Sequence, residues 1–235
     1  MKYSKLGTTD FKVSRVCLGT MTWGQQNTIE QAHEQMNYAV EMGINFFDTA
    51  ELYAVPTSAE TQGKTEEYIG AWFKETGNRD KIFLASKVTG PGFPWIRDGE
   101  ALTGKAVHKA IEGSLKRLQT DHVDLYQLHW PNRPFPHFGN NRAGLINFAK
   151  ENTSEIEDNL LDILEAIGDI VKQGKVLHFG LSDDTAWGIM KYLQLSSTHN
   201  LPRVQSIQNE FSLLNRSDDP YVAEVCAREN VSYLP

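Results

Sequence analysis

The stretch Asn45-Phe46-Phe47-Asp48-Thr49-Ala50-Glu51-Leu52-Tyr53 runs from an apolar segment directly into a carboxylate and then, within one loop, to a phenol. Residues 44–47 predict a short buried strand that leads into Asp48. In parallel α/β proteins, ligands bind at the carboxyl ends of the strands. Asp48 and Tyr53 are therefore candidates for chemistry. Taken alone, Asp48 is as typical of a turn cap, with Tyr53 packed on the rim.

The same unit of a short apolar strand and an amphipathic helix recurs along the chain. A hairpin from Lys2 to Ser14 precedes the repeated unit and is expected to cover one barrel end. The predicted strands are residues 13–18, 44–47, 82–87, 123–129, 176–182, 204–209 and 231–235. The predicted helices open near Thr28, Thr65, Thr103, Ser154, Thr185 and Asp219.

Some helices carry more specific signals. The predicted caps are the capping boxes Thr28-Ile29-Glu30-Gln31 and Ser154 to Glu157, and the pair Asp219-Pro220, with proline at the first helical position. In the helix that follows Thr185, the apolar spacing predicts that Trp187, Met190 and Leu193 face inward.

Strands that alternate regularly with amphipathic helices predict parallel βαβ units. We favour a (β/α)8 TIM barrel over a doubly wound sheet, because no glycine-rich dinucleotide fingerprint follows the first strand. Residues 1–235 are expected to form a single barrel domain with only about seven strands and six helices. The domain is therefore predicted to be incomplete at its C-terminus, as a fragment of a longer polypeptide or as a sheet with open edges.

Composition narrows the class of partner. The formal net charge is −7 and the pI is near 5.5, which disfavours a general nucleic-acid surface. No run approaches the ~20 apolar residues of a membrane helix, and no disulfide framework is readable from Cys17 and Cys226. We expect a cytoplasmic protein with a small-molecule partner; the sequence does not indicate its oligomeric state.

Two further strands end in polar side chains. Lys87 and His129 terminate the third and fourth predicted strands, as Asp48 terminates the second. Neighbouring strands lie ~4.8 Å apart, so these side chains and Tyr53 can meet at one rim. A free tyrosine has a pKa of ~10, and a nearby ammonium lowers it. The predicted chemistry is protonation of a carbonyl by Tyr53, with Asp48 keeping Lys87 charged and His129 directing the carbonyl oxygen.

Two long connections follow strand ends on the same side. Residues 88–102 and 130–153 are expected to shape a substrate pocket, with disordered surface insertions as the alternative.

The chain resembles the aldo-keto reductase family and is most similar to its Tas-like bacterial branch. The matching motifs are Asp48-Thr49-Ala50-Glu51-Leu52-Tyr53, Ala85-Ser86-Lys87, Leu128-His129-Trp130, Leu18 to Gly24, Gly113 to Leu118 and Gln208 to Arg216. The resemblance implies an oxidoreductase that reduces aldehydes or ketones to alcohols with a nicotinamide cofactor, usually NADPH. It also implies that Asp48, Tyr53, Lys87 and His129 are the catalytic tetrad.

The resemblance further assigns a cofactor site. Ser182 and Gln208 are expected to hold the nicotinamide carboxamide, and Gly19, Thr20 and Met21 to flank the ribose beside Asp48. Trp23 and Trp130 are the expected pocket walls. Asp183 stands where the family commonly has asparagine, and an ionised carboxylate accepts hydrogen bonds but donates none. Reduced cofactor affinity is therefore expected.

By the resemblance, the family's remaining cofactor contacts would follow Pro235. We therefore expect residues 1–235 to bind the cofactor weakly. They give no basis for choosing between NADPH and NADH. Three alternatives stay open. They are a nicotinamide-sensing regulatory protein on the same fold, an inactive fragment, and a metal-dependent barrel hydrolase using Asp48, His129 and His178. The hydrolase is disfavoured because His178 falls near the start of its strand, and no metal site is predicted.

Overall fold

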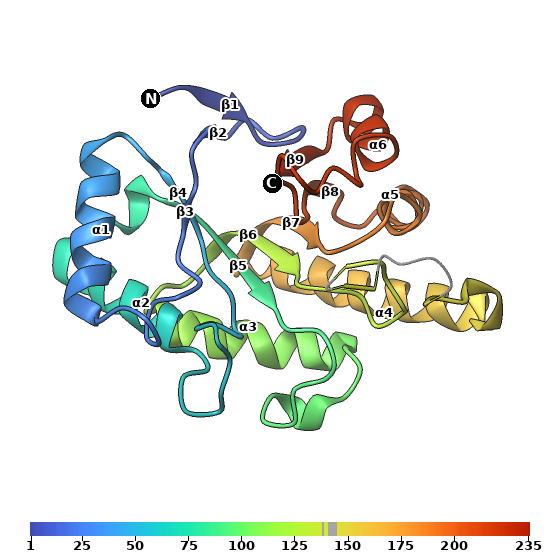
Figure 1. Ribbon diagram of the computed structural model, residues 1–235. Coiled ribbons are helices and arrows are strands. Elements are labelled where there is room, and N and C mark those ends of the chain that lie inside the picture. The colour runs from blue at the N-terminus through green and yellow to red at the C-terminus, as the bar shows by residue number, and fades with distance from the viewer. Residues whose placement is uncertain (138, 141–144) are drawn as a thin grey trace.

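The computed structural model describes residues 1–137, 139–140 and 145–235. Part of the predicted loop 130–153 therefore lies outside the described residues. The main element is a parallel sheet of seven strands in the order β3-β4-β5-β6-β7-β8-β9 (Figure 1). These strands are β3 (Leu18–Gly19), β4 (Phe46–Asp48), β5 (Phe83–Val88), β6 (Val123–Leu128), β7 (Val176–Ser182), β8 (Val204–Gln208) and β9 (Ser232–Leu234).

Helices connect the strands and cover one face of the sheet. The α-helices are α1 (Ile29–Glu41), α2 (Lys64–Thr76), α3 (Gly104–Leu118), α4 (Thr153–Lys172), α5 (Ala186–His199) and α6 (Val222–Glu229). Short 3₁₀ turns occur at Arg79–Lys81, Arg97–Gly99 and Phe148–Lys150. The sheet curls, and within the described residues β3 and β9 do not pair with each other. The architecture is a half-barrel of the predicted (β/α)8 type.

An antiparallel hairpin of β1 (Tyr3–Lys5) and β2 (Lys12–Ser14) lies at the amino ends of the strands, as predicted. The backbone N–H of Gly7 donates to Ser232 Oγ at 2.7 Å, and the N–H of Ser14 donates to Asn45 Oδ1 at 2.7 Å. These contacts tie the hairpin to both sides of the half-barrel. The opposite rim, where the strands end, stays uncovered by it.

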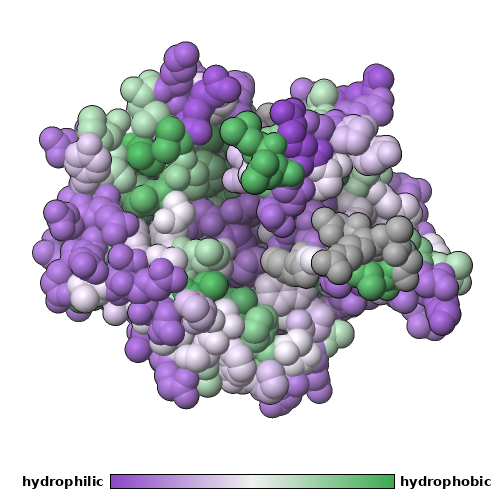
Figure 2. Space-filling view, in the orientation of Figure 1, coloured by the Kyte–Doolittle hydropathy of each residue, from purple (hydrophilic) through white to green (hydrophobic). Residues whose placement is uncertain are grey.

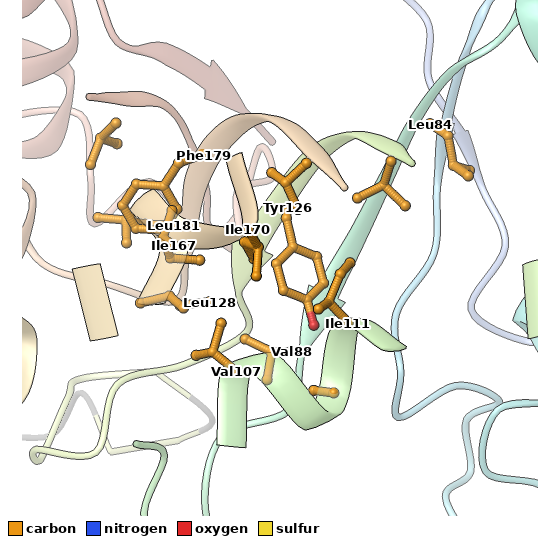
Figure 3. Close-up of a cluster of buried hydrophobic side chains, with 14 of the residues drawn as sticks. Leu84, Val88, Val107, Ile111, Tyr126, Leu128, Ile167, Ile170, Phe179 and Leu181 are labelled. Carbon is orange, nitrogen blue, oxygen red and sulfur yellow. The ribbon is translucent and has the colours of Figure 1, made fainter. Parts of the chain in front are cut away.

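The side-chain alternation of the strands separates two cores. Outward side chains pack against the helices in the larger core, where Figure 3 shows sheet and helix residues interleaved. That core includes Leu84, Val88, Val107, Ile111, Tyr126, Leu128, Ile167, Ile170, Phe179 and Leu181. Inward side chains form a smaller core beneath the hairpin with Leu6, Val13, Phe46, Phe83, Ala85 and Leu125. Because successive strand residues alternate faces, Asp48 and Lys87 point inward with Phe46 and Ala85.

One predicted strand is split. Residues 13–18 were expected to be continuous, but β2 ends at Ser14 and β3 begins at Leu18. The hydrogen-bond partner changes between them, because β2 pairs with β1 whereas β3 pairs with β4. The intervening residues turn the chain from the hairpin into the sheet.

Two of the predicted helix caps are wrong. Thr28 does form its capping box with Gln31. The α4 helix, however, is capped by Asn152, and Ser154 lies inside the first turn instead of capping it. Before α6, the Asp219 carboxylate pairs with Arg216, and the helix begins at Val222 without a side-chain cap.

The inward face of α5 also differs from the prediction. Leu193 is buried, but Trp187 is 42% exposed and Met190 43% exposed. Ile189 and Tyr192 turn toward the sheet instead. Among the described residues, no helix has both the length and the apolar character required to cross a bilayer.

The cap of α4 gives a direct stability test. Asn152 Oδ1 accepts the N–H groups of Ser154 at 3.1 Å and Glu155 at 3.5 Å. Asn152→Ala removes the single acceptor of both hydrogen bonds and should lower the free energy of unfolding by about 1 kcal/mol. Urea denaturation measures this change. Ser154→Ala is the matched control and should stay near the wild type; the reverse order of the two effects would contradict the observed cap.

Candidate active site

Three members of the predicted tetrad are joined by hydrogen bonds at the strand ends. Lys87 Nζ donates to Asp48 Oδ2 at 2.8 Å and lies 3.1 Å from Tyr53 Oη. It also donates to the Thr49 carbonyl oxygen at 3.0 Å. The ammonium therefore has all three of its hydrogens directed at oxygen atoms, and its position between carboxylate and phenol is fixed.

Lys87 is held in its charged form. Its side chain is 1% exposed, and burial alone would lower its pKa. The negative charge of Asp48 and the contact with Tyr53 outweigh this effect, so the pKa of Lys87 rises above its ordinary value. A protonated Lys87 matches the predicted role for this residue.

The electrostatics of Tyr53 differ from the expected lowering of its pKa. Burial raises the pKa of Tyr53 above its ordinary value, and it outweighs the opposing effect of Lys87. The phenol is therefore fully protonated at neutral pH. Lys87 still limits the rise, because it stabilises the phenolate that remains after a proton leaves. The structure thus contains a phenol that keeps its proton until a strong base forms beside it.

His129 follows the end of β6 and contacts Tyr53. The two rings lie 5.5 Å apart between centroids, edge to face. Burial, and secondly the charge of Lys87, place the pKa of His129 well below its ordinary value, so the imidazole is neutral at neutral pH. A neutral imidazole can donate one hydrogen bond to a carbonyl oxygen without supplying a second cation.

This shift predicts an acid-sensitive stability. The folded pKa of His129 lies below its unfolded value, so the unfolded state binds a proton first as the pH falls below about 6.5. Stability is then lost at up to about 1.4 kcal/mol per pH unit from this residue. In urea denaturation between about pH 8 and about pH 5, the free energy of unfolding of His129→Gln should fall less steeply with decreasing pH than that of the wild type. Equal slopes would contradict a neutral buried imidazole.

The predicted carboxamide-binding residues come together at the ends of β7 and β8. Ser182 and Gln208 are register partners, and the N–H of Asp183 donates to the Gln208 carbonyl at 3.0 Å. Gln208 Oε1 accepts from Gln127 Nε2 at 2.9 Å. This bond leaves the Gln208 amide N–H groups directed away from Gln127, so they can serve a ligand acceptor.

The predicted ribose-flanking residues lie along β3 and the loop that follows. Thr20 is buried, and its hydroxyl donates to the Asp48 carbonyl at 2.8 Å. Gly19 pairs in register with Asp48, and no atom lies within 4 Å of where its Cβ would be. Met21 is 46% exposed, and its carbonyl accepts from the Val55 N–H at 2.8 Å. This edge offers open backbone beside the tetrad.

A cavity of about 650 Å³ lies between the hairpin, β4 and β9. Asp48 and Gln208 line it, together with residues of the hairpin and of β9. Figure 2 shows the face of Figure 1 hollowed near its centre, with hydrophilic residues in the hollow. Asp48 of the tetrad and Gln208, which is predicted to bind the nicotinamide carboxamide, therefore line the same cavity.

The predicted aromatic walls have different positions. Trp130 packs with Tyr53 and Ile96, and its ring centroid lies 4.8 Å from that of His129. Trp23 is buried in the larger core, where its indole N–H donates to Gln35 at 3.2 Å. The Trp23 side chain is also only 1% exposed, so almost none of it is open to a ligand. Its predicted substrate contact therefore has no geometric support, whereas Trp130 borders the phenol.

Loop 88–102 is fixed to the site by a buried ion pair. Arg97 Nη1 donates to Glu51 Oε1 at 2.5 Å, and Arg97 Nη2 donates to the Thr89 carbonyl at 2.7 Å. Phe93, from the same loop, lies 5.8 Å from Trp130 between ring centroids. The loop therefore adds an apolar wall next to Trp130, as the prediction of a substrate pocket requires.

The structure contains a polar network at the same rim that was not predicted from the sequence. It runs through Arg133, Asp184, Asn209, Asp218 and Tyr233, which come from the loops after β6, β7 and β8 and from β9. Asn209 Nδ2 donates to the Asp184 carbonyl at 2.9 Å and to Asp218 Oδ2 at 2.7 Å. Asp184 and Asn209 lie just after strands β7 and β8, but Arg133 and Asp218 lie further along their loops, so no local pattern in the sequence links the members of this network.

The residues of the metal-hydrolase alternative do not gather. His178 lies at the hairpin end, with its ring 5.2 Å from Phe11 and stacked 6.5 Å from Phe83. Asp48 and His129 lie at the opposite ends of their strands. Within the described part of the chain, no three His, Cys, Asp or Glu side chains are grouped so that they could hold a metal ion.

Comparisons with known proteins give the family. The model of the "Aldo/keto reductase family" matches residues 15–235. Protein tas of Escherichia coli (strain K12) is 44% identical over 237 residues, which covers 100% of this chain and 67% of that protein. An uncharacterized oxidoreductase, YrpG of Bacillus subtilis (strain 168), is 34% identical over 221 residues, which cover 92% of this chain and 60% of that protein.

A more distant relative is an aryl-alcohol dehydrogenase of Pestalotiopsis microspora, 27% identical over 236 residues, with 95% of this chain and 53% of that protein covered. The chain thus spans between about half and two thirds of the length of these relatives. The match over residues 15–235 extends across all the strands and helices of the half-barrel, from β3 to β9. The chain therefore belongs to the aldo/keto reductase family of oxidoreductases.

Proposed function

We propose that the protein reduces aldehydes or ketones to alcohols, with NADPH as the hydride donor and Tyr53 as the proton donor. The observation that carries the proposal is the position of Lys87 Nζ, 2.8 Å from the Asp48 carboxylate and 3.1 Å from the Tyr53 hydroxyl. We place the reaction in the cytoplasm, where the unpaired Cys17 and Cys226 would stay reduced.

The residues at the rim fit a nicotinamide. A carboxamide needs both hydrogen-bond donors and acceptors, and Ser182 and the amide of Gln208 supply both next to Asp183. The open backbone at Gly19 lets a flat group approach Asp48. When bound, the cofactor supplies the hydride. The remaining chemistry falls to the side chains of this chain.

The proton would come from Tyr53. As the carbonyl carbon gains a hydride, its oxygen becomes a far stronger base than a phenolate, so a phenol with a raised pKa can still donate to it. The phenolate left behind is stabilised by Lys87, whose own charge is balanced by Asp48. Neutral His129, in contact with the Tyr53 ring, would donate a hydrogen bond that orients the carbonyl oxygen.

An aromatic aldehyde is the proposed substrate class. Trp130, Phe93 and Ile96 form an apolar wall beside Tyr53, and such a surface favours a flat ring over a charged chain. One relative is named as an aryl-alcohol dehydrogenase, which is the reverse reaction of the same class. We carry this substrate class to the present protein as part of the proposal.

The test is a panel of aromatic and aliphatic aldehydes with NADPH or NADH. We expect NADPH to be consumed with stoichiometric formation of the alcohol, measured by the cofactor absorbance and by chromatography of the product. A control without aldehyde corrects for slow oxidation of NADPH. Binding of the cofactor with no product from any aldehyde would instead support a nicotinamide-sensing role.

A further inference from the structure

Asp183 stands in an unusual position for a carboxylate. It follows β7 with a φ of 48° and is only 8% exposed. Its backbone N–H donates to the Gln208 carbonyl at 3.0 Å, so the backbone of Asp183 is held at the end of β8, directly after Ser182. Left-handed backbone at a non-glycine residue costs free energy, and Asp and Asn bear that cost better than most residues.

The surroundings of Asp183 are dominated by titratable groups. The imidazole of His137, from the loop after β6, lies 3.8 Å from Asp183 Oδ1 and is also buried. The other titratable groups that interact electrostatically with the Asp183 carboxylate are Lys87 on β5, Tyr53 after β4, Asp184 after β7, and Glu210 and Asp218 after β8. No hydrogen bond to the Asp183 carboxylate occurs among the described residues.

The loop that carries His137 is also held by a second contact. Arg133, from the same loop, pairs with buried Asp184. An arginine stays protonated throughout the working range. The loop is therefore tied to the end of β7 by the ion pair of Arg133 with Asp184, next to the contact of His137 with Asp183.

Asp183 changes charge close to neutral pH. Burial raises its pKa to about 7, Lys87 opposes the rise, and the nearby carboxylates of Glu210, Asp218 and Asp184 add to it. Below this pH the group is a neutral acid that can both donate and accept a hydrogen bond. Above it the group is an acceptor with a negative charge.

We propose that Asp183 determines which oxidation state of the nicotinamide the site prefers. The oxidised ring carries a positive charge that the reduced ring lacks. An ionised carboxylate beside the ring therefore favours the oxidised form, and a protonated one removes that preference. The inference rests on the proposed function, because it places the nicotinamide against Ser182, Asp183 and Gln208.

Two consequences follow by linkage. The ratio of the Kd for NADPH to the Kd for NADP⁺ should rise as the pH increases through about 7. Conversely, bound NADP⁺ should lower the pKa of Asp183, whereas NADPH should not lower it. Ionised Asp183 would therefore stabilise the bound NADP⁺ that remains after the hydride has left NADPH.

The experiment measures both Kd values by NMR titration at millimolar cofactor, which detects weak binding, from about pH 6 to about pH 8. In the wild type we expect the ratio to rise by about tenfold over this range. Asp183→Asn keeps the shape but cannot ionise, so its ratio should stay constant. The control Asp169→Asn, which removes a carboxylate from the exposed surface of α4, should behave as the wild type.

The outcomes separate the two proposals. A ratio that is independent of pH in the wild type, or unchanged by Asp183→Asn, overturns this inference while leaving the reductase proposal intact. A pH dependence that survives Asp183→Asn and disappears in His137→Gln also overturns it, because His137 would then be the titrating group. Failure of both cofactors to bind at any concentration overturns the proposed function and this inference together.

Discussion

Substitution of Tyr53 by phenylalanine is expected to reduce the rate of carbonyl reduction by about 10²- to 10⁴-fold. The substitution removes the only proposed proton donor, while the ring keeps its packing against Trp130 and Ile96. The steady-state kcat with an aromatic aldehyde measures the effect. Because the ring remains, binding of NADPH and the free energy of unfolding should change little.

Tyr38→Phe is the matched control, since Tyr38 is 64% exposed on α1 and lies outside the tetrad. It should retain the wild-type kcat. Persistence of NADPH consumption in Tyr53→Phe at the wild-type rate would remove Tyr53 as the acid. The reaction would then need another proton source, and the contact of Lys87 with the phenol would have only a structural meaning.

Replacement of Lys87 by methionine is expected to affect both activity and stability. It leaves the Asp48 carboxylate, only 10% exposed, without its cation. Removing one partner of a buried ion pair typically costs about 3–5 kcal/mol. The pKa of Tyr53 should also rise further, because Lys87 is the group that holds it down. Urea denaturation and kcat, measured on the same preparation, report the two effects.

A second substitution separates charge from packing. In Asp48→Asn/Lys87→Met the uncompensated carboxylate is absent, so part of the lost stability should return while kcat stays low. Lys109→Met, on the exposed surface of α3, is the control for loss of a lysine. If Lys87→Met unfolds at the wild-type urea concentration, the ion pair contributes little and the proposed ordering of Tyr53 by Lys87 is wrong.

Much of the fold was predictable because strand and helix periods are local properties. The order of strands and helices and the burial of α3 through Val107, Ile111 and Leu118 follow from spacing alone. Alternation along β4 and β5 also placed Asp48 and Lys87 on one face. Helix ends were less predictable, since Asn152 competes with Ser154 as a cap and both are good capping residues.

Side-chain environments were the least predictable feature. Trp187 fits an inward apolar stripe, yet it stays at the surface under the cations of Arg133, 5.0 Å away, and Lys191, 5.8 Å away. Arg133 comes from a loop that is distant in sequence, so no local sequence pattern predicts that its guanidinium lies over the Trp187 ring. The raised pKa of Tyr53 likewise depends on burial by residues that are far away in sequence.

The sequence by itself determined the half-barrel, the family and the set of polar residues at the strand ends, because each depends on short-range periodicity or on contiguous motifs. Only the tertiary structure decided the distances around Lys87, the neutral state of His129 and the pairing of Asp183 with His137. The physical reason is that desolvation and charge interactions act through space. They are fixed by which loops meet at the rim, and that meeting depends on the packing of the whole sheet.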